Sequence, residues 1–342
     1  MPITIRGGED LRGMDIPLRP APLFKISGTV TSSVAAPPSN DGSPLVMAFL
    51  HLADRDLQTP NDSTTANQAG RFSLTPNTGQ FEIAGVAPGS YELLARVADP
   101  SVGTGLAAFS WGRLQVDIED RDVTGVSIGI TPSPVLKGTV RVVGGGSLPP
   151  NLKITLNPMG GISRVALYQL ISTRGTPVAA DGSFSVASVP PGQFRLNALP
   201  GLPADFYIAD VRQGSTSVFD SGFAVGNREP APLEILIAPG SGVVEGVVTD
   251  GPTRVLPGAV VVLVPEPGRL ENRALYATAL SDASGRFSFK AVAPGDYQLF
   301  AWESTPTNAY TSVAFLKKYE GRGRAVRLAQ KGAVNAEVPI IR

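Results

Sequence analysis

The chain has 342 residues, and its 29 Lys and Arg side chains balance its 29 Asp and Glu side chains. A balanced chain without long runs of one charge lacks the basic surface through which proteins bind nucleic acids or anionic membranes. The absence of Cys and the single histidine, His51, exclude Cys and His zinc sites, Cys nucleophiles and Ser-His-Asp triads. We therefore expect no catalytic residue, no metal site, no cofactor and no nucleic-acid partner.

The composition also bounds the kind of structure. With 38 Gly and 31 Pro residues, the chain favours many turns and few long helices. It has no apolar stretch of 18 residues, and its N-terminus lacks the basic and apolar regions of a signal peptide. We expect no membrane insertion and no export signal within this chain, and we interpret the lone His51 as a surface residue or an internally satisfied strand residue.

The first 23 residues have a pattern of their own. Residues 3–22 align with residues 114–134, where an Asp, a Gly and an Ile recur at matching positions. Alternating apolar positions in the segment are Ile3, Ile5, Leu11, Met14, Ile16 and Leu18. Because a strand with free backbone groups pairs with a sheet edge, residues 1–23 are expected to be either the last strands of a preceding module or an assembly strand. Such an assembly strand would pair with this chain or with a second molecule.

Short strands follow from residue 24 onward. The apolar runs alternate with period two and are separated by Gly, Pro, Asn and Asp, which is the pattern of strands joined by turns. The runs cover residues 24–30, 45–52, 71–74, 80–86, 90–97, 113–118 and 125–130. Seven strands in about 110 residues predict a two-layer antiparallel sandwich. Between them, the polar residues 54–70 have the composition of a surface loop, and the sequon at Asn61 makes glycosylation the alternative reading of that loop.

The same scheme returns twice along the chain. The string GQFEIAGVAPGSYELLA begins at Gly79, GSFSVASVPPGQFRLNA at Gly182 and GRFSFKAVAPGDYQLFA at Gly285, so the two intervals are equal at 103 residues. A Gly-x-Val step accompanies each copy, at Gly28, Gly138 and Gly246. We therefore predict three sandwich domains, over residues 24–133, 134–240 and 241–342. Their short Pro-containing links predict a semi-rigid, elongated array.

A Pro-Gly turn stands at the centre of each repeat. In the first repeat it is Ala87-Pro88-Gly89, with Phe81 before it and Tyr91 after it. Pro at the second turn position and Gly at the third predict a type II turn with φ > 0 at the Gly. The flanking rings are predicted to be core residues.

These residues resemble a known family. The Gly-x-Val strand followed by the pattern D-x-x-G-x-F, V-x-P-G-x-Y and L-x-A is similar to the carboxypeptidase regulatory-like family. The resemblance implies an all-β fold of prealbumin-like or Cna B-type, Ig-like Greek-key sandwiches in exported, non-catalytic modules of bacteria. It does not imply the zinc carboxypeptidase site, which His51 alone cannot form. Lys25 and Lys137 do not occupy equivalent positions, so a shared isopeptide bond is not expected.

The third repeat contains one candidate ligand site. Trp302, Tyr310 and Tyr319 could form an aromatic platform for sugars, although packing at the edge of the core is the favoured reading. The sequence thus leaves three functions open. The first is a structural or spacer array of an extracellular or cell-envelope bacterial protein, which contacts other modules of the same protein or copies of itself. The second is a fibre subunit that assembles through the N-terminal strand, and the third is a carbohydrate- or protein-binding module.

Overall fold

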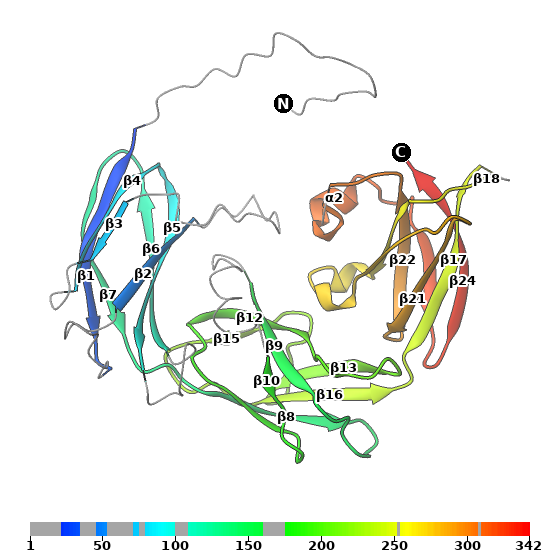
Figure 1. The fold of residues 1–342 in the computed structure, drawn as a ribbon, viewed down its shortest axis with the longest axis horizontal. Coiled ribbons are helices and arrows are strands. Elements are labelled where there is room, and N and C mark those ends of the chain that lie inside the picture. Colours follow the sequence, from blue (N-terminus) through cyan, green and yellow to red (C-terminus); the bar gives the residue numbers. More distant parts are fainter. Residues whose placement is uncertain are drawn as a thin grey trace, which may run out of the picture.

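The computed structural model describes residues 22–34, 46–52, 71–74, 79–99, 109–159, 175–251, 254–306 and 309–342. This part of the chain is almost entirely β, as predicted. Within these ranges, every strand pairs only with strands of its own repeat. In Figure 1 the three strand sets follow one another in an arc, with the second repeat in the middle.

The first repeat forms two sheets. Their orders are β3-β4-β1-β7 and β2-β5-β6. The strands are β1 (Phe24–Ser32), β2 (Val46–Leu52), β3 (Arg71–Leu74), β4 (Gln80–Val86), β5 (Gly89–Ala98), β6 (Phe109–Ile118) and β7 (Val123–Ile130). All seven predicted strands are present, and β6 begins earlier than its pattern indicated.

The second repeat again forms two sheets, of orders β11-β8-β16-β13-β14 and β10-β9-β12-β15. Its strands are β8 (Leu136–Val142), β9 (Lys153–Met159), β10 (Thr176–Pro177), β11 (Ser183–Val186), β12 (Gly192–Ala198), β13 (Phe206–Gln213), β14 (Thr216–Ser217), β15 (Phe223–Val225) and β16 (Leu233–Pro239). The strands β8, β11 and β12 correspond in sequence to β1, β4 and β5. The same motif therefore builds the same part of each repeat.

In the third repeat a parallel pairing of β22 with β24 joins the strands into one eight-stranded sheet. The strands are β17 (Gly242–Asp250), β18 (Arg254–Val255), β19 (Val260–Pro265), β20 (Ala277–Leu280), β21 (Arg286–Val292), β22 (Gly295–Trp302), β23 (Arg324–Leu328) and β24 (Ala333–Ile341). Short helices interrupt them at η4 (Pro267–Arg269), η5 (Arg273–Leu275), η6 (Ala309–Thr311) and α2 (Val313–Lys317). No helix of the described residues is long and apolar enough to span a membrane.

The Gly-x-Val glycines mark one strand pairing in every repeat. Gly28 of β1 lies opposite Phe81 of the antiparallel β4 and opposite Val126 of the parallel β7. A Cβ at Gly28 would lie closer than 3.0 Å to the backbone of Val126, and Gly138 and Gly246 meet equivalent backbone oxygens. Glycine therefore permits the close approach of the first and last strands. Because this pairing is parallel, the sheets are mixed and not wholly antiparallel as predicted.

The Pro-Gly turn differs from the predicted type II geometry. Gly89 and Gly295 have positive φ values, as predicted, but these values are 155° and 159°, whereas a type II turn needs about +80° at its third position. Both glycines begin strands, β5 and β22. The turn is held instead by a tyrosine two residues on, because the hydroxyls of Tyr91 and Tyr297 donate to the carbonyl oxygens of Ala87 and Ala293 at 2.8 Å.

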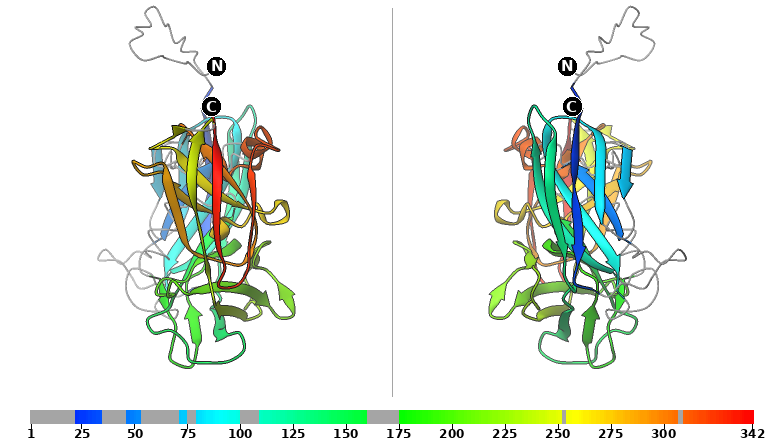
Figure 2. Two further views of the ribbon diagram at one scale, coloured as in Figure 1. Left: turned by 90° about the vertical axis from the view of Figure 1, so that its right-hand side faces the viewer. Right: turned by 90° about the vertical axis from the view of Figure 1, so that its left-hand side faces the viewer.

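The rings beside the turn are core residues, as predicted. Phe81, Phe184 and Phe287 are between 4% and 5% exposed and belong to the apolar clusters of their repeats. The two side views in Figure 2 overlay the first and third repeats, so the arc is flat. The array is thus curved and not elongated as the short links predicted. Contacts at the junctions between the repeats determine this curvature.

Candidate functional site: the junctions between repeats

The central strand of the first repeat is buried on both faces. One face of β5 carries Tyr91, Leu93, Ala95 and Val97, which pack into the core of their own repeat. The opposite face carries Glu92, Leu94 and Arg96, whose exposures are only 1%, 2% and 8%. Leu94 packs into the apolar cluster of the second repeat, so this outer face of β5 is a junction.

Three hydrogen bonds connect the β6 side of this outer face to the β11–β12 connection of the second repeat. The backbone N–H of Phe109 donates to Ser188 Oγ and the indole Nε1 of Trp111 donates to the Ser188 carbonyl oxygen, both at 3.0 Å. Arg113 Nη1 donates to the carbonyl oxygen of Pro191 at 3.0 Å. Ser188 has a φ of 58°, a left-handed conformation that is uncommon for a residue other than Gly and is held here by tertiary contacts. The Pro-Gly turn of the second repeat therefore docks on the first.

Glu92 holds Arg113 in position for this contact. The guanidinium Nε of Arg113 donates to Glu92 Oε1 in an ion pair, while Glu92 Oε2 has no hydrogen-bond partner among the described residues. Burial raises the pKa of the Glu92 carboxyl, and the neighbouring Arg113 charge partly opposes this rise. The pairing of β2 with β5 places His51 directly opposite Glu92.

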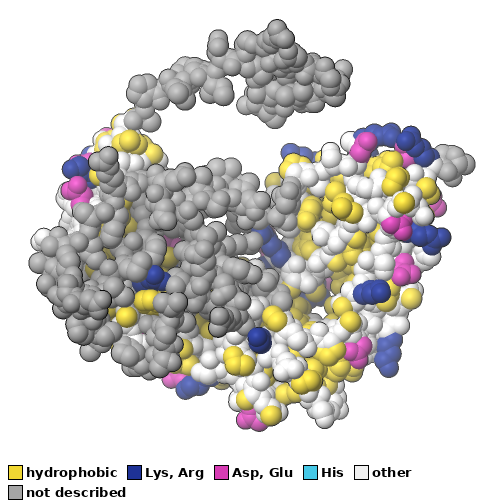
Figure 3. Space-filling model, viewed as in Figure 1, with side chains coloured by type: hydrophobic (Ala, Val, Ile, Leu, Met, Phe, Trp, Pro, Cys, Tyr) yellow, Lys and Arg dark blue, Asp and Glu magenta, His cyan; other side chains and the backbone are white. Residues whose placement is uncertain are grey.

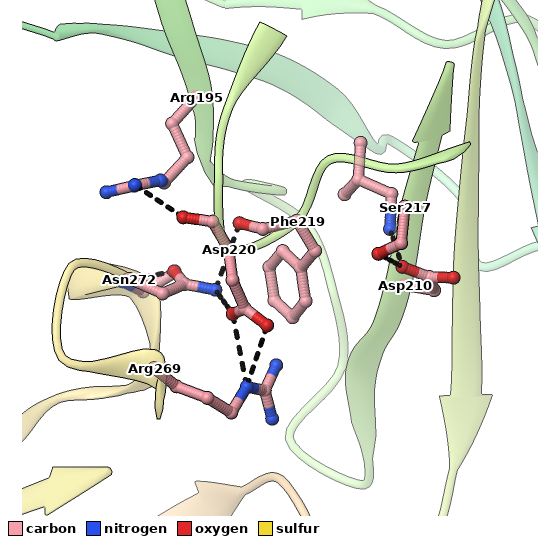
Figure 4. A network of polar contacts seen from close by, with 9 residues as sticks. Arg195, Asp210, Ser217, Phe219, Asp220, Arg269 and Asn272 are labelled. Atoms are coloured by element: carbon pink, nitrogen blue, oxygen red, sulfur yellow. Dashed lines mark hydrogen bonds and ion pairs between the residues drawn. The ribbon is translucent and has the colours of Figure 1, made fainter. Parts of the chain in front are cut away.

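The second junction is formed by the β19–β20 connection, which contains η4 and η5 and reaches the second repeat. Asp220 is its centre (Figure 4): Arg269 Nε lies 3.0 Å and Asn272 Nδ2 2.8 Å from its carboxylate oxygens. Arg195 of β12 donates to the carbonyl oxygen of Asp220 at 2.5 Å and to that of Glu271. Burial lowers the pKa of Arg195, but two nearby carboxylates favour its charged form.

Asn272 is completely buried and uses both ends of its amide. Its Nδ2 donates to the Phe219 carbonyl oxygen at 3.1 Å, and its Oδ1 accepts from the backbone N–H of Ala274 at 3.2 Å, which caps η5. Leu275 of η5 completes the contact by packing into the apolar cluster of the second repeat. The buried polar contacts fix the position of the connection, and Leu275 anchors it.

The two junctions follow one rule. Glu92 and Arg195 occupy the same place in the repeat motif, three residues after the Gly of the turn. Both point away from their own sandwich, and both are linked, directly or through Arg113, to a backbone carbonyl oxygen of the next repeat. The first and second repeats therefore each offer the outer face of their central strand to the repeat that follows. Sequence reasoning missed this face. The signal for it in the first repeat is the consecutive apolar residues Leu93, Leu94 and Ala95, which break the period-two alternation of β5.

The third repeat covers the same face with its own chain. Phe300 and Trp302 of β22 are 3% and 2% exposed, and the rings of Phe315 and Tyr319 lie 5.7 and 5.4 Å from that of Trp302. Tyr310 packs against the same cluster. The structure thus brings together Trp302, Tyr310 and Tyr319, the predicted platform, with Trp302 buried beneath. Their role in binding a ligand stays a prediction.

Two other predicted features lie outside the described residues. These are the sequon at Asn61 and the apolar positions of the N-terminal segment from Ile3 to Leu18. Among the described residues, no group of three or more His, Asp or Glu side chains could hold a metal ion.

Comparison with known families agrees with the motif pattern. Residues 243–338 match the family model of the carboxypeptidase regulatory-like domain. This match covers most of the third repeat. The first two repeats share its Gly-x-Val and Pro-Gly motifs, and their membership remains a prediction.

Solved structures similar to the chain include bacterial surface proteins. The Streptococcal ancillary pilin has 13% identity and a TM-score of 0.28, over 93% of this chain and 99% of the pilin. The major pilin subunit BcpA of Bacillus cereus has 10% identity and a TM-score of 0.20, over 94% and 99%. The minor pilin GBS52 of Streptococcus agalactiae has 15% identity and a TM-score of 0.23, over 60% and 95%. No curated protein matches the chain.

Proposed function

We propose that this chain is a non-catalytic spacer array of an extracellular or cell-envelope bacterial protein, in which three sandwich domains hold attached parts at a fixed separation. The carboxypeptidase regulatory-like domain at residues 243–338 supports the non-catalytic, exported character. The observation that carries the spacer function is the construction of the junctions. Side chains that are more than nine-tenths buried, Glu92, Arg195 and Asn272, organise both of them.

The energetics favour closed junctions over freely hinged ones. Each intramolecular hydrogen bond contributes about 0.5–1.5 kcal/mol, and bonds to charged groups contribute more. Opening the first junction would break three such bonds and expose Leu94, whereas opening the second would break the contacts of Asp220 and expose Leu275. A linker of a few residues gains too little conformational freedom to offset these losses.

Small-angle scattering tests the spacer function. We expect the profile of the full chain to fit one curved arrangement at all concentrations. Combined Arg113→Ala and Arg195→Ala substitutions should raise the radius of gyration, because both side chains bind a carbonyl oxygen of the following repeat. An unchanged profile in this double variant, or an ensemble of arrangements in the native chain, would refute the spacer function as proposed.

The alternative functions have separate tests. If residues 3–18 add a strand to a second molecule, light scattering should show assemblies that deletion of residues 1–20 abolishes. If Tyr310 and Tyr319 stack on sugars, glycan binding should be lost in the double Ala variant. A monomer before and after the deletion excludes the fibre, and the absence of glycan binding at micromolar concentration excludes the sugar site.

A further inference from the structure

The Pro-Gly turn, which joins β4 to β5, β11 to β12 and β21 to β22, is buried or half-buried only where a repeat precedes it. In the second repeat, Pro190 is buried and Pro191 is half-buried against the first repeat. In the third repeat, Ala293 is half-buried against the cluster that joins Leu275 to the second repeat. In the first repeat, the equivalent Ala87 and Pro88 are exposed. The sequence of the turn is nearly the same in the three repeats, so its position in the array accounts for the difference.

The two junctions also have a direction. In both junctions the end of a repeat that carries its Pro-Gly turn, here called the turn end, meets the outer face of the central strand in the repeat before it. The contact is made by Pro191 of the turn itself at the first junction and by Glu271 of the neighbouring β19–β20 connection at the second. Three repeats joined in this way leave one turn end without a preceding face, at Ala87 and Pro88. They also leave one outer face without a following turn, on β22 of the third repeat.

The outer face of β22 is occupied by a segment inserted between β22 and β23. Residues 309–319, which contain η6 and α2, lie over Phe300 and Trp302. Phe300, Trp302 and Phe315 form stacked and tilted ring pairs at 5.3 and 5.7 Å. Hydrophobic side chains gather on the part of the third repeat that faces the interior of the arc (Figure 3). This segment, which we call the cap, takes the place that a following repeat occupies on β5 and β12.

We propose that the Ala87-Pro88 turn is a docking site for the outer sheet face of a further carboxypeptidase regulatory-like repeat on the N-terminal side, and that the cap closes the array on its C-terminal side. The proposal rests on the proposed spacer function and names its partner. An independent observation identifies that partner as a repeat: residues 3–22 carry the same pattern as residues 114–134, which include the last strand of the first repeat.

The cap leaves one buried polar atom of the outer face unsatisfied, as each docked repeat also does. At the first junction, the indole N–H of Trp111 donates to a carbonyl oxygen of the next repeat. Beneath the cap, the indole N–H of Trp302 is buried with no hydrogen-bond partner in the described part of the chain. An unsatisfied buried donor is unfavourable, so the contact of the cap with Trp302 is the place where substitutions should open it.

Cross-linking between molecules tests the proposal, because the chain contains no Cys. Pro88→Cys places a thiol on the free turn, and Gln298→Cys places one on β22 at the position equivalent to Glu92. Phe315→Glu with Tyr319→Glu opens the cap by setting charges against Trp302. With a short bismaleimide, we expect the open-cap chain to form a ladder of linked molecules with a yield about tenfold above that of the capped chain.

Two controls make the result specific. Ala87→Arg in the open-cap chain should abolish the ladder by blocking the turn, and Ala283→Cys in place of Pro88→Cys should give only the background yield. A second open-cap variant, with residues 304–322 replaced by a Gly-Ser link, covers the case in which the charged variant does not fold. Equal yields with the cap closed, or with Ala283→Cys, would overturn the proposal, as would the absence of a ladder in a folded open-cap variant. The spacer function is measured separately, by the distances between repeats within one molecule.

Discussion

Single residues determine how closely the strands approach. Gly246 lies between Phe287 of β21 and Ala336 of β24, and a Cβ there would lie closer than 3.0 Å to the backbone carbonyl oxygen of Ala336 and to the Phe287 ring. The backbone of a paired strand cannot move away without breaking its ladder. The Gly of the Gly-x-Val motif is thus a packing requirement.

Gly246→Ala should therefore destabilise the chain by about 1–3 kcal/mol, the usual cost of overpacking. The control is Gly226→Ala, because the added Cβ at Gly226 meets no atom within 4 Å. Thermal unfolding monitored by circular dichroism measures both. Equal melting of the two variants would show that β17 and β24 do not approach as described.

The buried carboxyl of Glu92 predicts a pH dependence. Because burial raises its pKa, the folded chain binds this proton more tightly than the unfolded chain does, in which Glu has a pKa of about 4.3. The stability of the native chain relative to Glu92→Gln should consequently fall as the pH rises from about 4.3 through the raised pKa, and then stay constant.

Denaturant titrations of both proteins across this pH range measure the difference. Glu119→Gln, which removes an exposed carboxylate, controls for the change in net charge. A difference that increases with pH would mean that the Arg113 charge outweighs burial at this site.

At the scale of elements, the connection between β19 and β20 is a docking arm and not merely a loop. Its η4 and η5 helices are held by Asn272, which is fully buried between Phe219, Asp220 and Ala274. Asn272→Ala would leave the Phe219 carbonyl oxygen and the Ala274 amide without these partners, at a cost of about 1–3 kcal/mol.

We expect this variant to raise amide hydrogen exchange in η5 while the β17–β24 pairing stays protected. Asn227→Ala, at an exposed position of the second repeat, should leave exchange in η5 unchanged. Exchange that rises equally in β24 would indicate unfolding of the whole repeat and not release of the arm.

The strands were predictable and the junctions were not, for physical reasons. Period-two alternation gave all seven strands of the first repeat, because one face of each strand packs on its own core. The parallel pairing of β1 with β7 involves residues far apart in sequence. Alternation within a strand does not indicate which strand it pairs with or in which direction. The junction contacts are equally remote, since Trp111 and Ser188 are 77 residues apart and Arg195 and Glu271 are 76.

The packing of the aromatic cluster also could not be predicted from the sequence pattern. Its residues were recognised as a group, but whether Trp302 faces solvent or packs beneath α2 depends on a five-residue helix that has no periodic signal. The sequence also indicated the wrong turn type, although the predicted positive φ at Gly295 is present, because the hydroxyl of Tyr297 contributes to holding the turn.

At the scale of the whole molecule, three similar repeats form a flat arc, and the second and third repeats each dock on the outer strand face of the repeat before (Figures 1 and 2). The curvature is thus a property of two interfaces with the same polarity. If both interfaces stay closed, the separation between the two ends of the array is fixed, as the proposed spacer function requires.

The distance between the first and third repeats tests this account most directly. Spin labels at Asp120→Cys and Glu337→Cys, both exposed, report that distance by pulsed electron spin resonance in a chain with no other Cys. We expect one narrow distribution, which broadens when Arg113→Ala and Arg195→Ala loosen the two junctions. A broad distribution in the native chain, unchanged by these substitutions, would show that the repeats move independently and would contradict the account.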